Sequence, residues 1–283
     1  MNYGYLLKIW KNITLGNMGS AGPFSTIHLK GHRMNKTEEY RYFLKDTIRK
    51  SIDFRNTDQH RGVPVPPIEK PYDSNARRIQ LPKSDQWIQK IEKKDLVSAI
   101  SNRRSRRRFT SNELSIDELA FLLWATQGIR QPEGGNLAYR TVPSAGARHS
   151  FETYLFVMRV EGIQPGLYRY LPISNELLFV CDVQNMEKRL ASACLGQSFV
   201  GKGAVTFVWT TIPYRMEWRY SLAAHRVILI DAGHVCQNLY LACEAIQAGT
   251  CAVAAYDQEL LDELLNIDGL DEFSVYLAPV GKI

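Results

Sequence analysis

No hydrophobic run in this 283-residue sequence approaches the roughly 18 apolar residues that a membrane-spanning helix needs. The N-terminal stretch Tyr5–Trp10 is too short and too polar to form the core of a signal peptide. We therefore expect a cytoplasmic protein without a membrane segment. With 45% hydrophobic and 23% charged residues, the chain can bury a core, and its length predicts one large domain plus an additional segment.

The sequence also lacks a cysteine pattern that would predict disulfide pairing. The cysteines are odd in number, stand mostly in apolar surroundings and form no CxxC motif, so the sequence indicates neither a disulfide framework nor a zinc site. We expect reduced core residues and no metal site. The five cysteines are Cys181, Cys194, Cys236, Cys243 and Cys251.

Acidic residues are absent from residues 1–33, which carry Lys8, Lys11, Lys30 and Arg33 and thus four of the six net positive charges. The remaining sequence is nearly balanced, and this weakens any argument for nucleic-acid binding from overall charge. The segment shows no clean periodicity. We therefore expect residues 1–33 to be a disordered arm, or a start site assigned too early.

Residues 34–90 are expected to form a helix followed by an extended segment. Asn35 and Glu38 have the spacing of a capping box, and the apolar residues that follow recur at helical spacing. Prolines then recur through residues 62–86, which predicts an extended course over a surface. The apolar positions of this helix are Tyr40, Phe43, Leu44, Ile48 and Ile52.

Residues 91–283 are expected to form the compact domain. Helices are predicted near 95–102, from a capping box at Ser115 to Gly128, and at 185–195 and 223–248. Strands are predicted at 154–160, 167–170, 177–180, 204–212 and 274–279. Few strands among irregularly alternating helices predict an α+β fold, with a mixed sheet between helical layers.

The run Arg103–Phe109 has the densest charge. Such a run can be a solvated basic face or a nucleic-acid patch. Here, however, an apolar helix precedes it and a capped helix follows it, so we expect a structured turn. Serine between guanidinium groups suits a phosphate, because arginine binds its oxygens bidentately and serine adds a short donor.

A second segment, Pro143–Arg148, has only small side chains before its arginine. It can be a simple loop. Small side chains would also let a flat ring system lie against the backbone, while Arg148 contacts anionic or carbonyl oxygens.

Together with two further segments, these runs resemble the nitroreductase family, and within it the SagB-type branch that includes azoline-to-azole dehydrogenases. The resemblance covers roughly residues 90–283. It depends on the order of the motifs along the chain. They are Arg103–Phe109, Pro143–Arg148, Asp231–Leu239 and Pro279–Lys282.

The resemblance implies a homodimer that binds FMN at the subunit interface. It assigns the flavin phosphate and ribityl chain to Arg103, Arg104, Ser105, Arg107 and Lys282. It assigns the ring to Pro143, Ser144, Ala145, Gly146 and Arg148, and the ring edge to the segment 249–255. Many family members have Glu-Gly where this chain has Ala254 and Ala255, so only backbone contacts can be carried over there.

Arg219 and Tyr220 match a Lys-Tyr pair that is implicated in proton removal in azoline dehydrogenases. Because arginine is a poor base, we expect Arg219 to act electrostatically and Tyr220 to be the acid or base. A core tyrosine beside a surface arginine is the alternative. His149 and His234 are ambiguous in the same way, and a structural role is expected for His234.

We therefore predict an FMN-dependent oxidoreductase that transfers hydride between a reduced nicotinamide and a small acceptor, such as a nitroaromatic or quinone. The alternative is an azoline-to-azole dehydrogenase of a peptide-modifying system, with oxygen as the acceptor. A non-catalytic partner subunit and a nucleic-acid-binding protein are weaker alternatives. No nucleic-acid motif accompanies the arginine run, and no Gly-rich dinucleotide fingerprint is visible.

Overall fold

The computed structural model describes residues 28–29, 32–33, 35–133 and 137–283. The expectation of a disordered arm or early start therefore falls mostly outside the described residues. Within that segment, β1 (His28–Leu29) pairs antiparallel with β2 (His32–Arg33). The contacts divide the chain into two units, Met1–Ile48 and Arg49–Ile283, which we describe separately.

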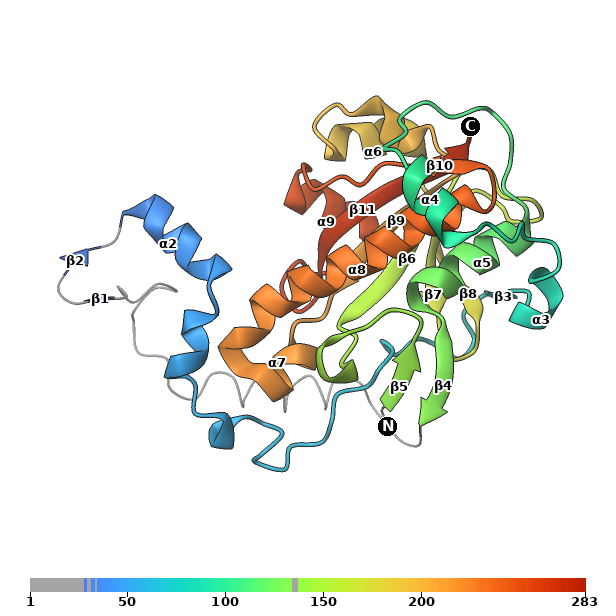
Figure 1. Cartoon of the computed structure of the whole chain (residues 1–283). Coiled ribbons are helices and arrows are strands. Elements are labelled where there is room, and N and C mark those ends of the chain that lie inside the picture. The colour runs from blue at the N-terminus through green and yellow to red at the C-terminus, as the bar shows by residue number, and fades with distance from the viewer. Residues whose placement is uncertain (1–27, 30–31, 34, 134–136) are drawn as a thin grey trace. The chain divides into compact units, whose positions relative to one another are not determined.

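The first unit contains the predicted helix α2 (Lys36–Leu44), shown in blue in Figure 1. Its capping box is confirmed, since the side chain of Asn35 accepts from the Glu38 amide and that of Glu38 accepts from the Asn35 amide. The helix is shorter than the apolar spacing suggests, because Lys45 is extended and a 3-10 helix, Asp46–Ser51, follows.

The second unit is built on a seven-stranded sheet, and the α+β class is confirmed. Its strand order is β10-β11-β9-β6-β7-β8-β3, and every strand pair is antiparallel. The expected mixed character is limited to isolated parallel bridges, Ser105 with Thr250 and Leu114 with Val160. The strands are β3 (Arg78–Gln80), β6 (Phe151–Val157), β7 (Gly166–Leu171), β8 (Glu176–Cys181), β9 (Val205–Thr211), β10 (Ala248–Thr250) and β11 (Phe273–Lys282).

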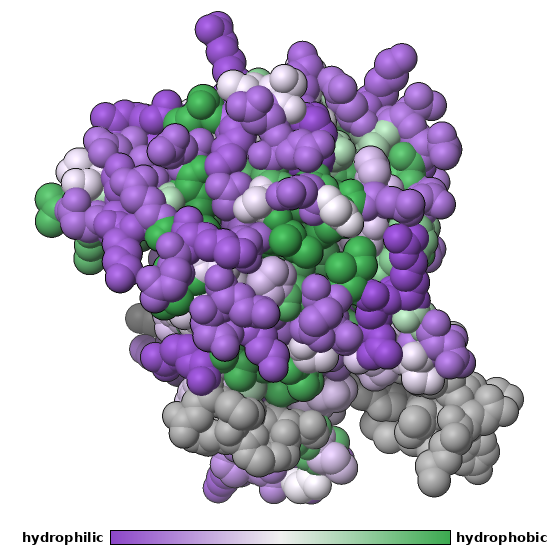
Figure 2. All heavy atoms as spheres, turned by 90° about the vertical axis from the view of Figure 1, so that its right-hand side faces the viewer, coloured by the Kyte–Doolittle hydropathy of each residue, from purple (hydrophilic) through white to green (hydrophobic). Residues whose placement is uncertain are grey.

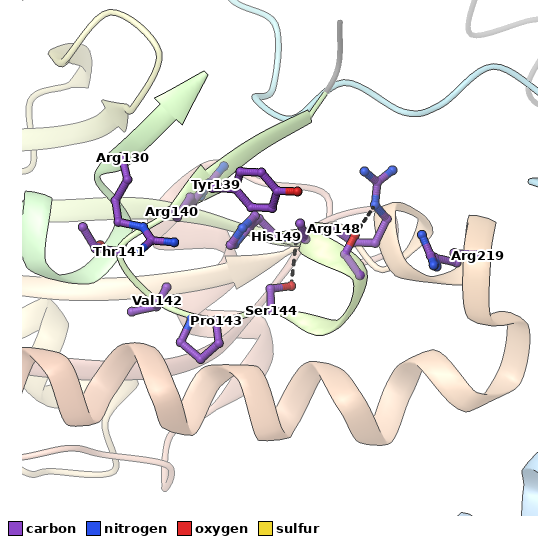
Figure 3. A pocket seen from close by; sticks show the side chains of 12 residues that line it. Arg130, Tyr139, Arg140, Thr141, Val142, Pro143, Ser144, Arg148, His149 and Arg219 are labelled. Atoms are coloured by element: carbon purple, nitrogen blue, oxygen red, sulfur yellow. Dashed lines mark hydrogen bonds between the residues drawn. The ribbon is translucent and has the colours of Figure 1, made fainter. Parts of the chain in front are cut away.

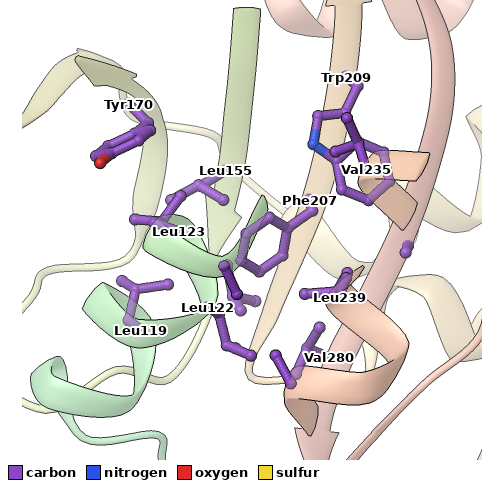
Figure 4. Close-up of a cluster of buried hydrophobic side chains, with 14 of the residues drawn as sticks. Leu119, Leu122, Leu123, Leu155, Tyr170, Phe207, Trp209, Val235, Leu239 and Val280 are labelled. Atoms are coloured by element: carbon purple, nitrogen blue, oxygen red, sulfur yellow. The ribbon is translucent and has the colours of Figure 1, made fainter. Parts of the chain in front are cut away.

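Helices cover both faces of this sheet. Along β9, Phe207 and Trp209 point into one core cluster while Val208 points into the other, as the alternation of a strand requires. The first cluster includes Leu123 of α5 and Leu239 of α8 (Figure 4). The second is covered by α6 and α9. The helices are α3 (Ser84–Trp87), α4 (Leu96–Asn102), α5 (Ile116–Gln127), α6 (Met186–Ala193), α7 (Tyr214–Tyr220), α8 (Ala224–Glu244) and α9 (Gln258–Leu265).

The Pro-rich segment 62–86 is extended over much of its length, but it contains the edge strand β3, and helix α3 begins within it at Ser84. The turn at residues 58–63, where this segment begins, holds α7 in place. The Tyr214 hydroxyl donates to Asp58 at 2.7 Å, and the Trp218 indole N–H donates to the Val63 carbonyl at 2.9 Å. The Gln59 amide donates to the Trp218 carbonyl at 2.9 Å. Residues 58–63 therefore form a strap across the helix that ends at Tyr220. We call them the α7 strap.

The surface in Figure 2 is mainly hydrophilic, with apolar side chains exposed in the middle of that face. None of the helices in the described part of the chain is long and apolar enough to cross a membrane. The same residues contain no group of three or more His, Cys, Asp and Glu side chains that could hold a metal ion.

Candidate functional site

The arginine run is a structured turn that is fixed to α8 and β10. It begins where α4 ends, and the Arg103 guanidinium lies 5.2 Å from the centre of the Tyr240 ring. The Ser105 hydroxyl lies 3.1 Å from the Tyr240 hydroxyl, and the Arg106 amide donates to the Thr250 carbonyl at 2.9 Å. Tyr240, which sequence reasoning did not single out, thus anchors the turn.

This turn lines an open pocket of about 580 Å³, which we call the arginine-turn pocket. Among the described residues that line it, none is an aspartate or glutamate, and the Arg106 Nε is buried without a hydrogen-bond partner. An unpaired buried donor in a pocket lined by arginines fits an anionic group such as a phosphate. Its lining residues are Arg104, Ser105, Arg106, Arg107, Arg108, Phe109, Thr110 and Ile283.

The Lys282 amine is not brought into this pocket. It donates to the Glu118 carboxylate at 2.5 Å and to the Ile246 carbonyl at 2.6 Å. Its backbone carbonyl, in contrast, accepts from the Thr110 amide at 2.8 Å at the end of the arginine run. Lys282 therefore supports the turn through its backbone and ties the start of α5 to β11 through its side chain.

The segment Pro143–Arg148 is a tight loop with an unusual backbone. Gly146, Ala147 and His149 all have positive φ, at 58°, 52° and 46°. The Ser144 hydroxyl accepts from the His149 amide at 3.0 Å, and the Ala145 amide donates to Asp231 of α8 at 3.3 Å. Two non-glycine residues at positive φ cost free energy that such anchoring must offset.

The loop lines a second pocket, of about 700 Å³, which we call the loop pocket (Figure 3). Besides residues of the loop, the lining includes Arg130, Tyr139, Arg140 and Arg219. The hairpin of β4 (Ile129–Glu133) and β5 (Leu137–Arg140) supplies the first three. Sequence reasoning missed this hairpin and its arginines.

Arg219 and Tyr220 lie against this loop, at the end of α7. A Cβ atom added to Gly146 would lie 2.6 Å from the Tyr220 hydroxyl oxygen and 3.1 Å from the Arg219 Nε. Glycine is therefore required at this close approach. The structure thus brings the acid/base candidate and its arginine to the segment assigned to the flavin ring.

The segment 249–255 adjoins the arginine turn. A Cβ atom on Gly249 would lie 2.7 Å from the Arg106 Cβ, and the Ala252 amide donates to the Tyr240 hydroxyl at 2.9 Å. Ala254 and Ala255 are exposed, and the Ala255 carbonyl accepts from Gln197. These contacts connect the ring-edge candidates to the phosphate candidates.

The loop and the turn lie at opposite edges of α8. Asp231 anchors the loop and Tyr240 anchors the turn, nine residues further along the helix. At 3.6 residues per turn, that separation is about two and a half turns and roughly 14 Å. The two side chains therefore point in opposite directions, and the two pockets share no lining residue.

His149 lies above a buried ionic network. Burial, with the charges of Arg140, Arg148 and Arg215, lowers the pKa of His149 to about 3, so the ring is neutral at ordinary pH. Arg215 pairs with Glu152 at 2.5 Å. These partners are far apart in sequence, and sequence reasoning did not single them out. His234 lies on the exposed face of α8, outside both pockets.

Comparison with known proteins shows the family. The nitroreductase family matches residues 100–282, more than half of the chain, and the chain therefore belongs to that family. The predicted resemblance to this family and its SagB-type branch is confirmed. Membership makes the chain a nitroreductase-family oxidoreductase.

Individual relatives agree with this assignment. MJ1384 of Methanocaldococcus jannaschii, a nitroreductase by its name, is 31% identical over 208 residues, which are 74% of this chain and 98% of that protein. The trifolitoxin-processing protein TfxB of Rhizobium leguminosarum bv. trifolii is 28% identical and the microcin B17-processing protein McbC of Escherichia coli is 26% identical. Each match covers 56% of this chain, but only 44% of TfxB and 58% of McbC.

Solved structures share the fold. A Ralstonia eutropha protein described as a nitroreductase superposes with a TM-score of 0.59 at 24% identity, over 77% of this chain and 98% of that one. A chain of the E. coli microcin synthetase McbBCD complex superposes with a TM-score of 0.53 at 19% identity, over 100% of this chain and 94% of that one.

Proposed function

We propose that this chain is an FMN-dependent oxidoreductase that transfers hydride between a reduced nicotinamide and a small acceptor, such as a nitroaromatic or quinone. The observation that carries the proposal is the arginine-turn pocket, in a chain of the nitroreductase family. Its described lining has four arginines and no aspartate or glutamate, and the Arg106 Nε is buried and unpaired. FMN, when bound, supplies the hydride-accepting and hydride-donating centre.

The arginine turn holds the phosphate in this proposal. Arg104, Arg107 and the Ser105 hydroxyl line the pocket, and Arg103 is kept at its edge by the Tyr240 ring. Guanidinium forks bind phosphate oxygens bidentately, with hydrogen bonds stronger than neutral ones. Lys282 contributes by fixing the end of the turn through its carbonyl.

The loop Pro143–Arg148 lies against the ring. Its small side chains leave the backbone accessible, and Arg148 donates its Nε to the Gly146 carbonyl while its guanidinium lies 5.3 Å from the Trp218 ring. The Tyr220 hydroxyl, close to Gly146, is placed to hold or move a proton at the ring face. Arg219 stabilises negative charge there.

A homodimer completes this site, because the loop and the turn lie at opposite edges of α8 and a second copy can bring one to the other. Exposed apolar side chains on α4, on α8 and on the 3-10 helix Ser221–Ala223 before α8 support such an interface, since exposed apolar surface can mark an interaction site. They are Leu96, Val97, Ile100, Leu222, Leu229 and Ile230.

A second candidate is an azoline-to-azole dehydrogenase of a peptide-modifying system. The relatives TfxB and McbC favour it, because both are named as processing proteins of peptide products. In that reaction Tyr220 would remove a proton from carbon, whereas nitro reduction requires no such step. The two candidate functions use the same cofactor site, but only azoline oxidation needs Tyr220 as a base.

The experiment is to purify the protein, load it with FMN and follow oxidation of NADH and NADPH with and without a nitroaromatic. The proposal predicts bound FMN and acceptor-dependent oxidation. An FMN-loaded protein without turnover on nitroaromatic, quinone or azoline acceptors would instead be a non-catalytic subunit. A protein without FMN that retards DNA in a gel would support the nucleic-acid alternative.

A further inference from the structure

The loop pocket has more positive charge than the proposed contacts of Arg148 and Arg219 with the flavin ring require. Four arginines line it, and none of its lining residues in the described part of the chain is an aspartate or glutamate (Figure 3). They come from the hairpin, the loop and the end of α7. The arginines are Arg130, Arg140, Arg148 and Arg219.

Arg140 is accounted for by the fold. Its Nη1 donates to the Gln127 side chain at 2.5 Å and its Nη2 donates to the Ile68 carbonyl at 2.9 Å. Burial and the charge of Arg215 lower the pKa of Arg140 to about 10, although Glu152 and Glu69 oppose that shift. Its hydrogen-bond donors have partners within the protein.

Arg148 and Arg219 have fewer hydrogen-bond partners than Arg140, and the Arg148 Nε donates only to the Gly146 carbonyl among the described residues. Among the described residues, no carboxylate forms an ion pair with either of them. Burial and then the charge of Arg219 lower the pKa of Arg148, which means that the two guanidinium groups repel each other at the pocket. Arg130 adds a third, exposed cation to the same lining.

Within the part of the chain that the structure describes, Arg130, Arg148 and Arg219 form no ion pair, and guanidinium groups around one pocket suit anionic oxygens. An anion between them would remove the repulsion and gain bidentate, charge-assisted hydrogen bonds. His149 is neutral and adds no charge of its own. The phosphate of the proposed cofactor is assigned to the other pocket, so a second anion would share these arginines with the flavin ring alone.

We propose that the loop pocket binds a carboxylate of the acceptor substrate between Arg148 and Arg219, with Arg130 at its rim. The inference rests on the proposed function and narrows it, because the preferred acceptor is then a small carboxylate-bearing molecule rather than a neutral one. We refer to Arg130, Arg148 and Arg219 as the pocket arginines.

The test is equilibrium binding of benzoate and of benzamide, its neutral isostere, to the FMN-loaded protein by calorimetry. Benzoate should bind about tenfold or more tightly, and the preference should weaken as salt rises. Arg148→Gln should remove most of the preference for benzoate. Arg130→Gln should reduce that preference too, and because Arg130 is exposed, this variant serves as the test if Arg148→Gln does not fold. Arg189→Gln, on the exposed face of α6, is the charge-matched control and should leave it unchanged.

Three outcomes would overturn the proposal. Equal binding of benzoate and benzamide would show that the pocket does not select charge. Loss of FMN in Arg130→Gln would show that the pocket arginines hold the cofactor. If Arg130→Gln or Arg148→Gln weakened nicotinamide binding and left benzoate binding unchanged, the pocket arginines would be assigned to the dinucleotide phosphates. If benzoate preference persists in a protein that takes up no FMN, the anion site stands and the proposed oxidoreductase function fails.

Discussion

The Tyr220 hydroxyl oxygen lies so close to Gly146 that a Cβ atom at residue 146 would approach it to 2.6 Å. Gly146 has φ 58° and lies in the loop assigned to the flavin ring, while Tyr220 is the last residue of α7. Two segments 74 positions apart in sequence therefore meet at one point, and their contact is open to direct test.

Gly146→Ala should lower the melting temperature by roughly 2–8 °C, because left-handed backbone costs an alanine about 1–2 kcal/mol. It should also slow any reaction that needs Tyr220, since its methyl group would displace the hydroxyl. Gly162→Ala is the matched control: it has φ 73° with no atom within 4 Å of an added Cβ. Equal activity losses in the two variants would show that the contact with Tyr220 is immaterial.

Tyr220→Phe should slow azoline oxidation far more than nitro reduction. Only azoline oxidation needs a proton removed from carbon, and such help is typically worth about 10²–10⁴-fold. The rates of both reactions are measured with the same FMN-loaded preparation, and the ratio of azoline oxidation to nitro reduction is compared between Tyr220→Phe and the unaltered protein. Equal slowing would make Tyr220 a structural or positioning residue, and the azoline candidate would lose its base.

His149→Asn should make the folded state less sensitive to acid. Burial, with the neighbouring arginines, lowers the folded-state pKa of His149 from 6.5 to about 3, so between these values the unfolded chain binds more protons. Stability contributed by the neutral ring is thus present above pH 6.5 and is lost as pH falls. Asparagine tolerates the positive φ of this position. Urea unfolding at pH 7 and pH 4.5 measures the free energy of unfolding of both proteins. If that free energy fell between pH 7 and pH 4.5 by the same amount in His149→Asn as in the unaltered protein, the prediction would be contradicted.

A chain that begins at Met34 should match the full chain in melting temperature and FMN content. Residues 1–33 lie outside the unit that holds both pockets. A chain that begins at Asp73 is the contrast, because it loses the α7 strap and the Lys70 amine, which pairs with buried Glu272 at 2.5 Å. Leaving a buried charge unpaired costs several kcal/mol. A marked loss in the Met34 chain would show that the segment packs.

Local signals in the sequence predicted much of this fold. The capping boxes at Asn35 and Ser115 and the apolar strand β9 are present as expected, because short-range hydrogen bonds and alternation determine them. Strand β10 was missed because its three residues, Ala-Gly-Thr, carry no strand pattern. Helix α9 was also missed, although Asp257 caps it and its buried leucines have helical spacing.

The site was less predictable, since its composition depends on distant contacts. The arginine turn and the small-residue loop were predicted as segments, but nothing local shows that Lys282 pairs with Glu118 or that Tyr240 anchors Ser105. The positions of Arg130 and Arg140 depend on a hairpin that the sequence pattern did not reveal. Long-range pairing of this kind follows only from the three-dimensional structure.

FMN titration tests the central claim most directly. The account predicts a yellow protein that releases about one FMN per subunit on denaturation. Arg107→Ala, which removes a guanidinium from the arginine-turn pocket, should weaken FMN binding at least tenfold, because a charge-assisted hydrogen bond contributes about 1.5–3 kcal/mol. Arg189→Ala should bind FMN as the unaltered protein does. A colourless protein that cannot be reconstituted, or an Arg107→Ala variant with unchanged FMN affinity, would contradict the account.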